Sequence, residues 1–349
     1  MSQAGLWAAE GGLGGPHGPG VPGPDGHAAA CIGETMAALV PTELEPLETA
    51  SALRVDVAGA ESNVAMYLAD HGVRARWISR LGDDAFGRRV ARTVGAAGVD
   101  VSGVTFDPVR ATGLLFKDPR PAAMATSVTY YRRDSAASAM GPHLLEVPAL
   151  RTASLWHLSG ITPALSRSCL ALTRAALDVT RRADGPRPAV SFDVNYRPAL
   201  WDEPPGDLLR ELADAADIVF TGLDEAAALW GAAVREPDDV RALLPNPRIV
   251  VVKNAARGAT AFHGDAMTFV PALRVVVVEP VGAGDAFAAG FLAELLNSGD
   301  AVRCLRSGHL TAASALAVAG DHGPLGDAAT RERLLTADEA AWARSQEGS

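Results

Sequence analysis

The chain is short of the residues that build disulfide frameworks and thiolate metal sites. Its 349 residues include only three cysteines, Cys31, Cys169 and Cys304, which are odd in number and lie far apart. Such spacing provides neither a disulfide framework nor a zinc site. We therefore expect a protein of a reducing cytoplasm that folds around an ordinary hydrophobic core.

Excess positive charge and long apolar runs are also missing. The formal net charge is −10 and the isoelectric point is near 5.3, so we expect no broad basic surface to neutralise nucleic-acid phosphates. No apolar run approaches the roughly 18 residues that span a bilayer. Nucleic acid and membrane are therefore not expected as partners, although a local basic site for a phosphate or carboxylate is compatible with this charge balance.

Lysine is almost absent, which makes arginine the default cation of the chain. Lys117 and Lys253 are the only lysines, whereas lysine and arginine together number 31. Lys253 directly follows an apolar, strand-like run. Its retention as lysine at that position favours a functional role over chance.

The N-terminal segment lacks the basic start and the apolar stretch of a targeting peptide. Residues 11–26 are instead rich in glycine and proline. A segment of this kind buries too little apolar surface to offset the entropy of ordering it. This composition predicts a disordered tail over residues 1–27.

The rest of the chain is typical of one α/β domain over residues 28–330, followed by a C-terminal helix or tail over 331–349. Apolar runs alternate with helical patterns, which predicts a three-layer sandwich with a mainly parallel sheet covered on both faces. The expected strands are 28–32, 77–79, 155–158, 189–194, 218–221 and 249–253, with a hairpin over 260–262 and 267–270. The expected helices are 58–71, 84–95, 166–182, 206–216, 224–230, 238–244, 285–297 and 301–319.

The pattern changes between residues 104 and 133, where strand-like runs follow each other without a helix between them. We expect this region and residues 34–58 to form a small accessory sheet that acts as a lid. Val128, Tyr130 and Arg132 share one face of its last strand, because side chains alternate with period two. Arginine pairs bidentately with carboxylates, so this face suits an acidic substrate. A solvated strand face or an oligomer contact is the alternative.

Residues 275–290 carry the clearest chemical signal. Four valines lead into a Gly-Ala-Gly turn, which a helix rich in small residues follows. We interpret the valines as a strand and expect the glycines at 282 and 284 to let backbone N–H groups face an anion. Asp285 in the first turn of the helix is then placed to accept a proton from an attacking hydroxyl.

Other interpretations of this motif differ in how well they fit. The simplest is a tight turn in which Asp285 caps the helix. A dinucleotide-binding fingerprint fits poorly, because Phe287 occupies the position of its third glycine and the motif lies near the C-terminus. The Gly-x-x-x-x-Gly-Lys-Ser/Thr pattern of a Walker loop does not occur in the chain.

Several ordered landmarks resemble the ribokinase-like (PfkB-type) carbohydrate kinases over residues 28–325. They are Gly-Ala-Glu-Ser-Asn at 59–63, Gly-Asp-Asp-Ala-Phe-Gly at 82–87, Glu225 at the start of a helix, and Gly-Ala-Gly-Asp at 282–285. The resemblance implies a ribokinase-like fold with a lid and transfer of a phosphoryl group from ATP to a sugar hydroxyl, with Asp285 as the base. It also implies Mg²⁺ and leaves a monovalent cation open.

Within that family the chain is most similar to kinases of the sugar acid 2-keto-3-deoxygluconate. The similarity lies in residues 130–138, 157–163, 193–201 and 320–322. It implies phosphorylation of the 6-hydroxyl to give 2-keto-3-deoxy-6-phosphogluconate, with Arg132 on the substrate carboxylate. The alternatives are a fructokinase, a nucleoside kinase, another sugar-acid kinase, or a catalytically silent sugar-binding protein on the same fold.

The resemblance also assigns residues to each ligand. Catalysis is assigned to Asp285 with Gly282, Ala283 and Gly284. Substrate binding is assigned to Gly59, Ala60, Glu61, Asn63, Tyr130, Tyr131, Arg132, Arg197, Asp285 and Asp321. ATP binding is assigned to Asn195, Tyr196, Arg197, Lys253, Asn254, Ala255, Ala256, Arg257, Gly258, Gly282, Ala283 and Gly284. Glu225 is assigned an indirect role at the metal.

Three positions depart from the family pattern. Glu279 stands where aspartate is usual, Gly222 replaces the asparagine of an Asn-x-x-Glu motif, and Leu115 replaces a sugar-contacting tyrosine. We expect the metal to be handled through its water shell and the selectivity among sugar acids to be relaxed. Lid strands expose edges that a partner commonly covers, so we also expect a homo-oligomer formed through the lid sheet.

Overall fold

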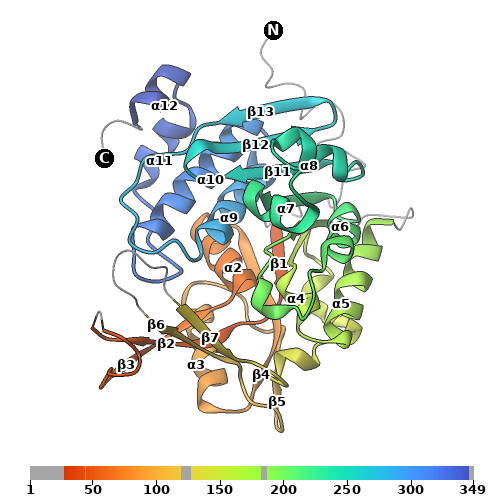
Figure 1. Ribbon diagram of the computed structural model, residues 1–349, viewed down its shortest axis with the longest axis vertical. Helices are drawn as coiled ribbons and strands as arrows, with labels where there is room; N and C mark the ends of the chain where they lie inside the picture. The colour runs from red at the N-terminus through yellow and green to blue at the C-terminus, as the bar shows by residue number, and fades with distance from the viewer. Residues whose placement is uncertain (1–26, 44, 119–126, 182–186, 346–349) are drawn as a thin grey trace.

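The computed structural model describes residues 27–43, 45–118, 127–181 and 187–345, and Figure 1 shows how they are arranged. The predicted N-terminal tail, except for His27, and the turn between the last two lid strands lie outside these residues. No helix in the described ranges is long and apolar enough to span a membrane.

Nine of the described strands form one central sheet, in the order β13-β12-β11-β10-β9-β8-β1-β4-β5. Neighbouring strands pair parallel except where β12 joins β11 and β13. The strands are β1 (Ala28–Ile32), β4 (Arg74–Gly82), β5 (Val104–Asp107), β8 (Leu155–Ser159), β9 (Ala189–Asp193), β10 (Ile218–Gly222), β11 (Ile249–Asn254), β12 (Gly258–His263) and β13 (Ala266–Val270). All residues of β1, β8 and β9 are buried, as continuous apolar strands require when helices cover both faces.

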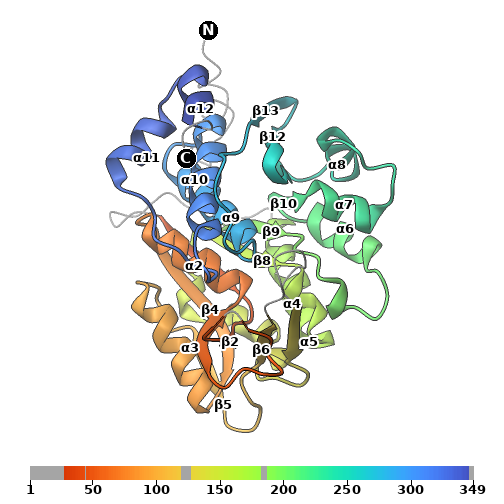
Figure 2. The ribbon, with the colours of Figure 1, turned by 60° about the vertical axis from the view of Figure 1, so that its left-hand side comes forward.

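Helices cover both faces of the sheet, which confirms the predicted three-layer α/β sandwich (Figure 2). One face packs against α2 (Ala60–Asp70), α3 (Ala85–Ala96), α9 (Ala283–Asn297) and α10 (Ala301–Leu316). The other face packs against α5 (Arg167–Leu177), α6 (Gly206–Asp214), α7 (Leu223–Trp230) and α8 (Pro237–Leu243), with the short α4 (Ile161–Ala164) following β8. Two C-terminal helices, α11 (Ala328–Leu335) and α12 (Glu339–Ser345), lie at the end of the molecule away from the lid (Figures 1 and 2).

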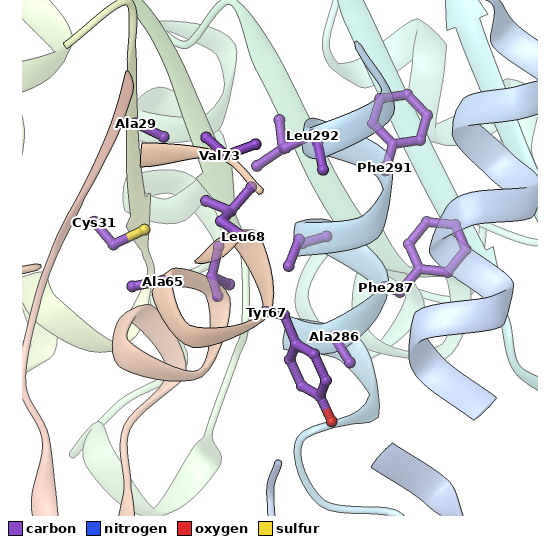
Figure 3. Packing of buried hydrophobic residues seen from close by; sticks show 14 of the residues in the cluster. Ala29, Cys31, Ala65, Tyr67, Leu68, Val73, Ala286, Phe287, Phe291 and Leu292 are labelled. Carbon is purple, nitrogen blue, oxygen red and sulfur yellow. The ribbon is translucent and has the colours of Figure 1, made fainter. Parts of the chain in front are cut away.

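Small residues fix the position of α9. A Cβ at Gly290 would overlap the backbone of Ser307 and the hydroxyl of Thr311, so α9 and α10 pack at close range. On another side of α9, Leu68 and Tyr67 of α2 pack toward Ala286 and its neighbours (Figure 3). This packing holds the N-terminal end of α9 in a fixed place beside α2.

The lid is a separate sheet of four described strands in the order β3-β2-β6-β7. These are β2 (Met36–Pro41), β3 (Leu53–Ala58), β6 (Leu114–Asp118) and β7 (Ser127–Tyr131). Residues 104–107, which we predicted as part of the lid, instead form β5 and pair with β4 at the edge of the central sheet. A strand of four residues can form its backbone hydrogen bonds with any free strand edge. Its sequence alone does not indicate which strand it will pair with.

The valine run before the Gly-Ala-Gly turn is not a strand, so that prediction was wrong. The described residues 271–282 form neither helix nor strand. Val276, Val277 and Val278 are 78%, 55% and 57% exposed. β-Branched residues favour strands mainly when they pack on a partly buried sheet surface, and these valines have no such surface. The segment crosses from β13 to α9. The amide of Val278 donates a hydrogen bond to Leu316 O (2.8 Å).

Candidate active site

Asp285 lies in the first turn of α9, where the chain enters the helix through a left-handed turn. Gly282 precedes the helix with φ of 84°, a conformation that costs a residue with a Cβ about 1–2 kcal/mol. A Cβ there would also lie 2.9 Å from Asp321 O and 3.1 Å from its Cα. Glycine at 282 therefore sets the direction in which the carboxylate and the first amides of α9 point.

Two asparagines hold the Asp285 carboxylate. Asn63 Nδ2 on α2 donates to Oδ2 (3.0 Å), and Asn195 Nδ2 after β9 donates to Oδ1 (3.1 Å). Asn195 adopts a positive φ of 41°, which asparagine tolerates better than most residues. Burial raises the pKa of Asp285 to about 7, although the hydrogen bond from Asn63 favours the ionised form and the nearby Arg197 does the same. A buried carboxylate that titrates near neutrality has the basicity that a general base needs.

We expect the pH dependence of catalysis to report this carboxylate. Because only ionised Asp285 can accept a proton, kcat/KM should fall with a limiting slope of one as the pH is lowered through about 7. An unshifted aspartate titrates near about 4, so a profile that stays flat down to about pH 5 would contradict the raised pKa of Asp285. The variant Arg197→Gln should move the midpoint to higher pH, because the Arg197 guanidinium lowers the pKa of Asp285; titration of the nucleotide itself would not respond to that change.

The cavity in front of Asp285 has a volume of about 560 Å³ and is bounded by the lid on one side and the carboxyl ends of the strands on the other. Its lid residues are Ala58, Leu115, Lys117, Val128 and Tyr130. Its charged residues from the main domain are Asp193, Arg197, Asp224, Glu225, Lys253, Asp285 and Asp321. Asn195, Tyr196, Gly282 and Gly284 complete the part of the wall that we had predicted.

Both lysines of the chain form ion pairs at this cavity wall. Lys253 Nζ lies 2.9 Å from Asp193 Oδ2 and a Cβ at Gly284 would lie 3.4 Å from the same ammonium, so Lys253 faces the start of α9. Burial opposes its charge, yet Asp193 and Glu225 hold the pKa of Lys253 above its ordinary value. Lys117 reaches from the lid to Asp321 Oδ1 at 2.9 Å.

Asp193 and Lys117 line the cavity beside Asp285, although no role was predicted for either from the sequence. Asp193 begins the stretch 193–201 that resembles the sugar-acid kinases. Its position at the carboxyl end of a predicted buried strand, where ligands bind in parallel sheets, could have indicated a functional role. Lys117 carried the same signal as Lys253, because both are rare lysines in an arginine-rich chain.

A second group of polar atoms lies behind Asp285, where α2 begins. The buried atoms without a hydrogen-bond partner in the described residues include five of this group: Thr35 Oγ1, Glu61 Oε2, Asn63 Oδ1, Arg132 Nε and Asn195 Oδ1. Burial raises the pKa of Glu61, while Ser159 and Thr162 donate to its other oxygen at 2.7 and 3.0 Å. Unsatisfied buried donors and acceptors are costly unless a ligand completes them. Their mixture suits a ligand with several hydroxyl groups.

The predicted face of Val128, Tyr130 and Arg132 is only partly as expected. Tyr130 lines the cavity, and the guanidinium of Arg132 lies 5.5 Å from the centre of its ring. Arg132 itself follows the end of β7 and forms a buried ion pair with Glu34. Tyr131, which the resemblance assigned to the substrate, does not line the cavity: alternation along β7 turns it outward, where it is 65% exposed and packs edge-on against Phe116.

A second cavity of about 770 Å³ opens on the other side of the Gly-Ala-Gly turn. Predicted residues that line it are Lys253, Ala255, Ala256, Gly258, Ala283 and Gly284. The rest of its wall is largely apolar, with Arg274 as the charged member, and comes from Ala259, Ala272, Leu273, Arg274, Val275, Val277, Pro280, Phe287, His309, Ala312, Ala313 and Leu316. Asn254 and Arg257, which we also predicted, do not line it.

Glu225 is held by hydrogen bonds on both oxygens. Oε2 accepts from Thr221 Oγ1 (2.9 Å) and from the Gly222 amide (3.0 Å), and Oε1 accepts from the Tyr196 amide. Burial raises its pKa, with the Asp193 carboxylate adding to the effect. Among the described residues no group of three or more His, Cys, Asp or Glu side chains is arranged to hold a metal ion. Glu225 therefore positions the backbone around Gly222 and Tyr196.

The fold and the site together define a kinase, a phosphotransferase whose acceptor is an alcohol group. A family model described as pfkB family carbohydrate kinase matches residues 27–327. The chain belongs to the pfkB family of carbohydrate kinases.

The names of three curated relatives specify different sugars. The chain is 33% identical over 314 residues to the 2-dehydro-3-deoxygluconokinase of Thermoproteus tenax, covering 88% of this chain and 93% of that protein. It is 34% identical over 299 residues to the 2-dehydro-3-deoxygalactonokinase of Haloferax volcanii, covering 83% and 91%. It is 31% identical over 269 residues to Fructokinase-1 of Oryza sativa subsp. japonica, covering 76% and 82%. A crystal structure of a PfkB protein from Polaromonas sp. JS666 is 34% identical, with a TM-score of 0.77 over 89% of this chain and 100% of that one.

Proposed function

We propose that the enzyme uses ATP to phosphorylate the 6-hydroxyl of 2-keto-3-deoxygluconate, also called 2-dehydro-3-deoxygluconate. The galactonate epimer is the nearest alternative acceptor and fructose the next, in line with the names of the relatives. The observation that carries the proposal is the unpartnered, buried Nε of Arg132, whose guanidinium lies over the Tyr130 ring and interacts electrostatically with the Glu61 carboxylate. A cation among hydroxyl-binding groups suits a sugar that carries a carboxylate.

In the proposed reaction the acceptor hydroxyl lies against Asp285. Asn63 and Asn195 orient the carboxylate, which takes the hydroxyl proton while the hydroxyl oxygen attacks the γ-phosphorus. The bond from that phosphorus to the bridging oxygen breaks, and ADP leaves. Lys253 and the first amides of α9 face the transferred group, where positive charge and N–H dipoles stabilise the transition state.

ATP is assigned to both sides of the Gly-Ala-Gly turn in this proposal. The triphosphate would lie along Lys253 and Gly284, which border both cavities. The base would lie in the apolar cavity against Phe287 and Leu273.

The residues present fit Mg²⁺ only through its water shell. Oε2 of Glu225 already accepts two hydrogen bonds, whereas Oε1 accepts one, so Oε1 could accept from a metal-bound water together with Asp224 on the same cavity wall. When bound, Mg²⁺ would neutralise charge on the phosphates of ATP.

A panel of acceptors tests the proposed function. Initial rates with ATP would be measured for 2-keto-3-deoxygluconate, 2-keto-3-deoxygalactonate, fructose, ribose and adenosine. We expect the highest kcat/KM for the gluconate-derived acid, followed by its epimer. A higher kcat/KM for any neutral acceptor would overturn the assignment of a sugar acid.

Arg132 should discriminate acids from neutral sugars. A lone Arg132→Met change would leave the Glu34 carboxylate buried without its partner, so the variant to test is the double change Arg132→Met with Glu34→Gln. A charged hydrogen bond contributes about 1.5–3 kcal/mol, so kcat/KM for the sugar acid should fall about 10- to 100-fold. The value for fructose should change far less, and Glu34→Gln alone provides the control. Equal losses for acid and fructose would show that Arg132 only supports the fold.

A further inference from the structure

The segment between β13 and α9 forms a wall of the apolar cavity without secondary structure of its own. Leu273, Val275 and Val277 all lie in this segment and face the cavity. Helices and sheets hold their residues by repeated backbone hydrogen bonds. Within the described residues, this irregular wall has only a few backbone hydrogen bonds to its neighbours, including those from Ala272 to Arg257 O (3.4 Å) and from Val278 to Leu316 O (2.8 Å), so side-chain hydrogen bonds to its carbonyls add to what holds it.

Two ring N–H groups hold the start of this segment. His309 on α10 donates from Nε2 to the carbonyl of Val270 (3.0 Å), and Trp342 on α12 donates from Nε1 to the carbonyl of Pro271 (3.1 Å). Burial lowers the pKa of His309 to about 4, which keeps the ring neutral with its proton on the donating nitrogen. His309 also lines the cavity and contacts Phe287 edge-on, with ring centres 5.1 Å apart.

Trp342 is fixed in turn by the C-terminal helices. It is 2% exposed although it belongs to the last described helix. The Arg306 guanidinium lies 5.0 Å from the centre of its ring and donates to the carbonyls of Leu335 (3.0 Å) and Ala337 between α11 and α12. The indole therefore joins the end of the chain to the cavity wall, more than 70 residues away in sequence.

We propose that Trp342 is a positioning residue for the nucleotide, acting through the carbonyl of Pro271 to hold residues 271–277 in the shape that receives the base of ATP. This inference rests on the proposed placement of ATP in the apolar cavity. It gives the C-terminal helices α11 and α12 a role in nucleotide affinity, although neither lines the cavity.

The test compares two tryptophans that make the same kind of hydrogen bond. Trp342→Phe keeps an aromatic ring in the core and removes the N–H group. Trp230→Phe removes a matching bond, from Nε1 to the carbonyl of Gly206 (3.0 Å), at a position that lines neither cavity. We expect Trp342→Phe to raise KM for ATP about three- to tenfold, the range expected for one hydrogen bond, with kcat and KM for the sugar within about twofold. Trp230→Phe should leave all three near the wild-type values.

A third variant separates failure of the inference from failure of the nucleotide placement. Ala313→Phe fills the apolar cavity from α10 and should raise KM for ATP by more than tenfold. If Ala313→Phe leaves KM for ATP unchanged, the placement of ATP in this cavity is wrong and the inference falls with it. If Ala313→Phe weakens ATP binding but Trp342→Phe does not, only the positioning role is wrong. A rise in the KM of both substrates with Trp342→Phe would also overturn it, because it would indicate a general loss of structure.

Discussion

The variant Asp285→Asn should lose turnover by about 10²- to 10⁴-fold, the usual contribution of a general base, while it still binds both substrates. Asparagine has nearly the same shape as aspartate and retains an oxygen for the amide of Asn63 or Asn195, so the site should keep its geometry. The asparagine side chain cannot accept the proton of the sugar hydroxyl. Steady-state kcat, together with equilibrium binding of ATP and of the sugar acid, separates these two effects.

Asp107→Asn is the matched control for this change. Asp107 is also buried, with 2% of its surface exposed, and it accepts from Arg80 Nε at 3.0 Å at the end of β5. It lines neither cavity. We expect Asp107→Asn to lower thermal stability and to leave kcat unchanged within about twofold. If Asp285→Asn retains more than about a tenth of wild-type turnover, Asp285 is not the base.

The second large effect should follow from Gly282→Ala. The new methyl group would lie 2.9 Å from Asp321 O at a backbone φ of 84°, so the turn must shift. The shift moves the first amides of α9 and the Asp285 carboxylate together. Loss of one transition-state donor costs about 10²–10³ in kcat, and we expect a fall of at least about one hundredfold, measured as kcat with saturating substrates.

Gly264→Ala distinguishes loss of the active-site turn from ordinary backbone strain. Gly264 also has a positive φ, 56°, but a Cβ there would meet no atom within 4 Å, in the hairpin between β12 and β13. It should lower stability slightly and leave kcat near the wild-type value. Similar kcat losses in both variants would mean that the position of Gly282 has no special catalytic importance.

Local patterns were enough to predict the fold. Strand β1 matches its expected range to the residue, because an apolar run between a tail and a glycine has few other interpretations. The helices from α5 to α8 lie where they were expected, although their ends differ from the expected ones by up to five residues. The valine run before Gly282 misled because strand preference is decided by the surface on which a segment packs.

The candidate site was predicted as a set of residues rather than as a geometry. The hydrogen bond between Asn63 and Asp285 joins residues 222 positions apart, and no pattern in a single sequence encodes such a distance. The ion pair between Glu34 and Arg132 was likewise not predictable from the sequence. The short polar stretch after β1 that contains Glu34 gave no reason to expect a partner for Arg132, which lies about a hundred residues later.

The positions of the two lysines have a practical consequence for chemical labelling. Lys117 and Lys253 are the only side-chain amines in the chain, and both lie in the cavity beside Asp285 with 6% and 20% of their side chains exposed. Reductive methylation or acylation of amines therefore has no side-chain target on the outer surface. Isotope-labelled methyl groups introduced at lysine would give two spectroscopic probes, one on the lid and one on the main domain, that line the same cavity.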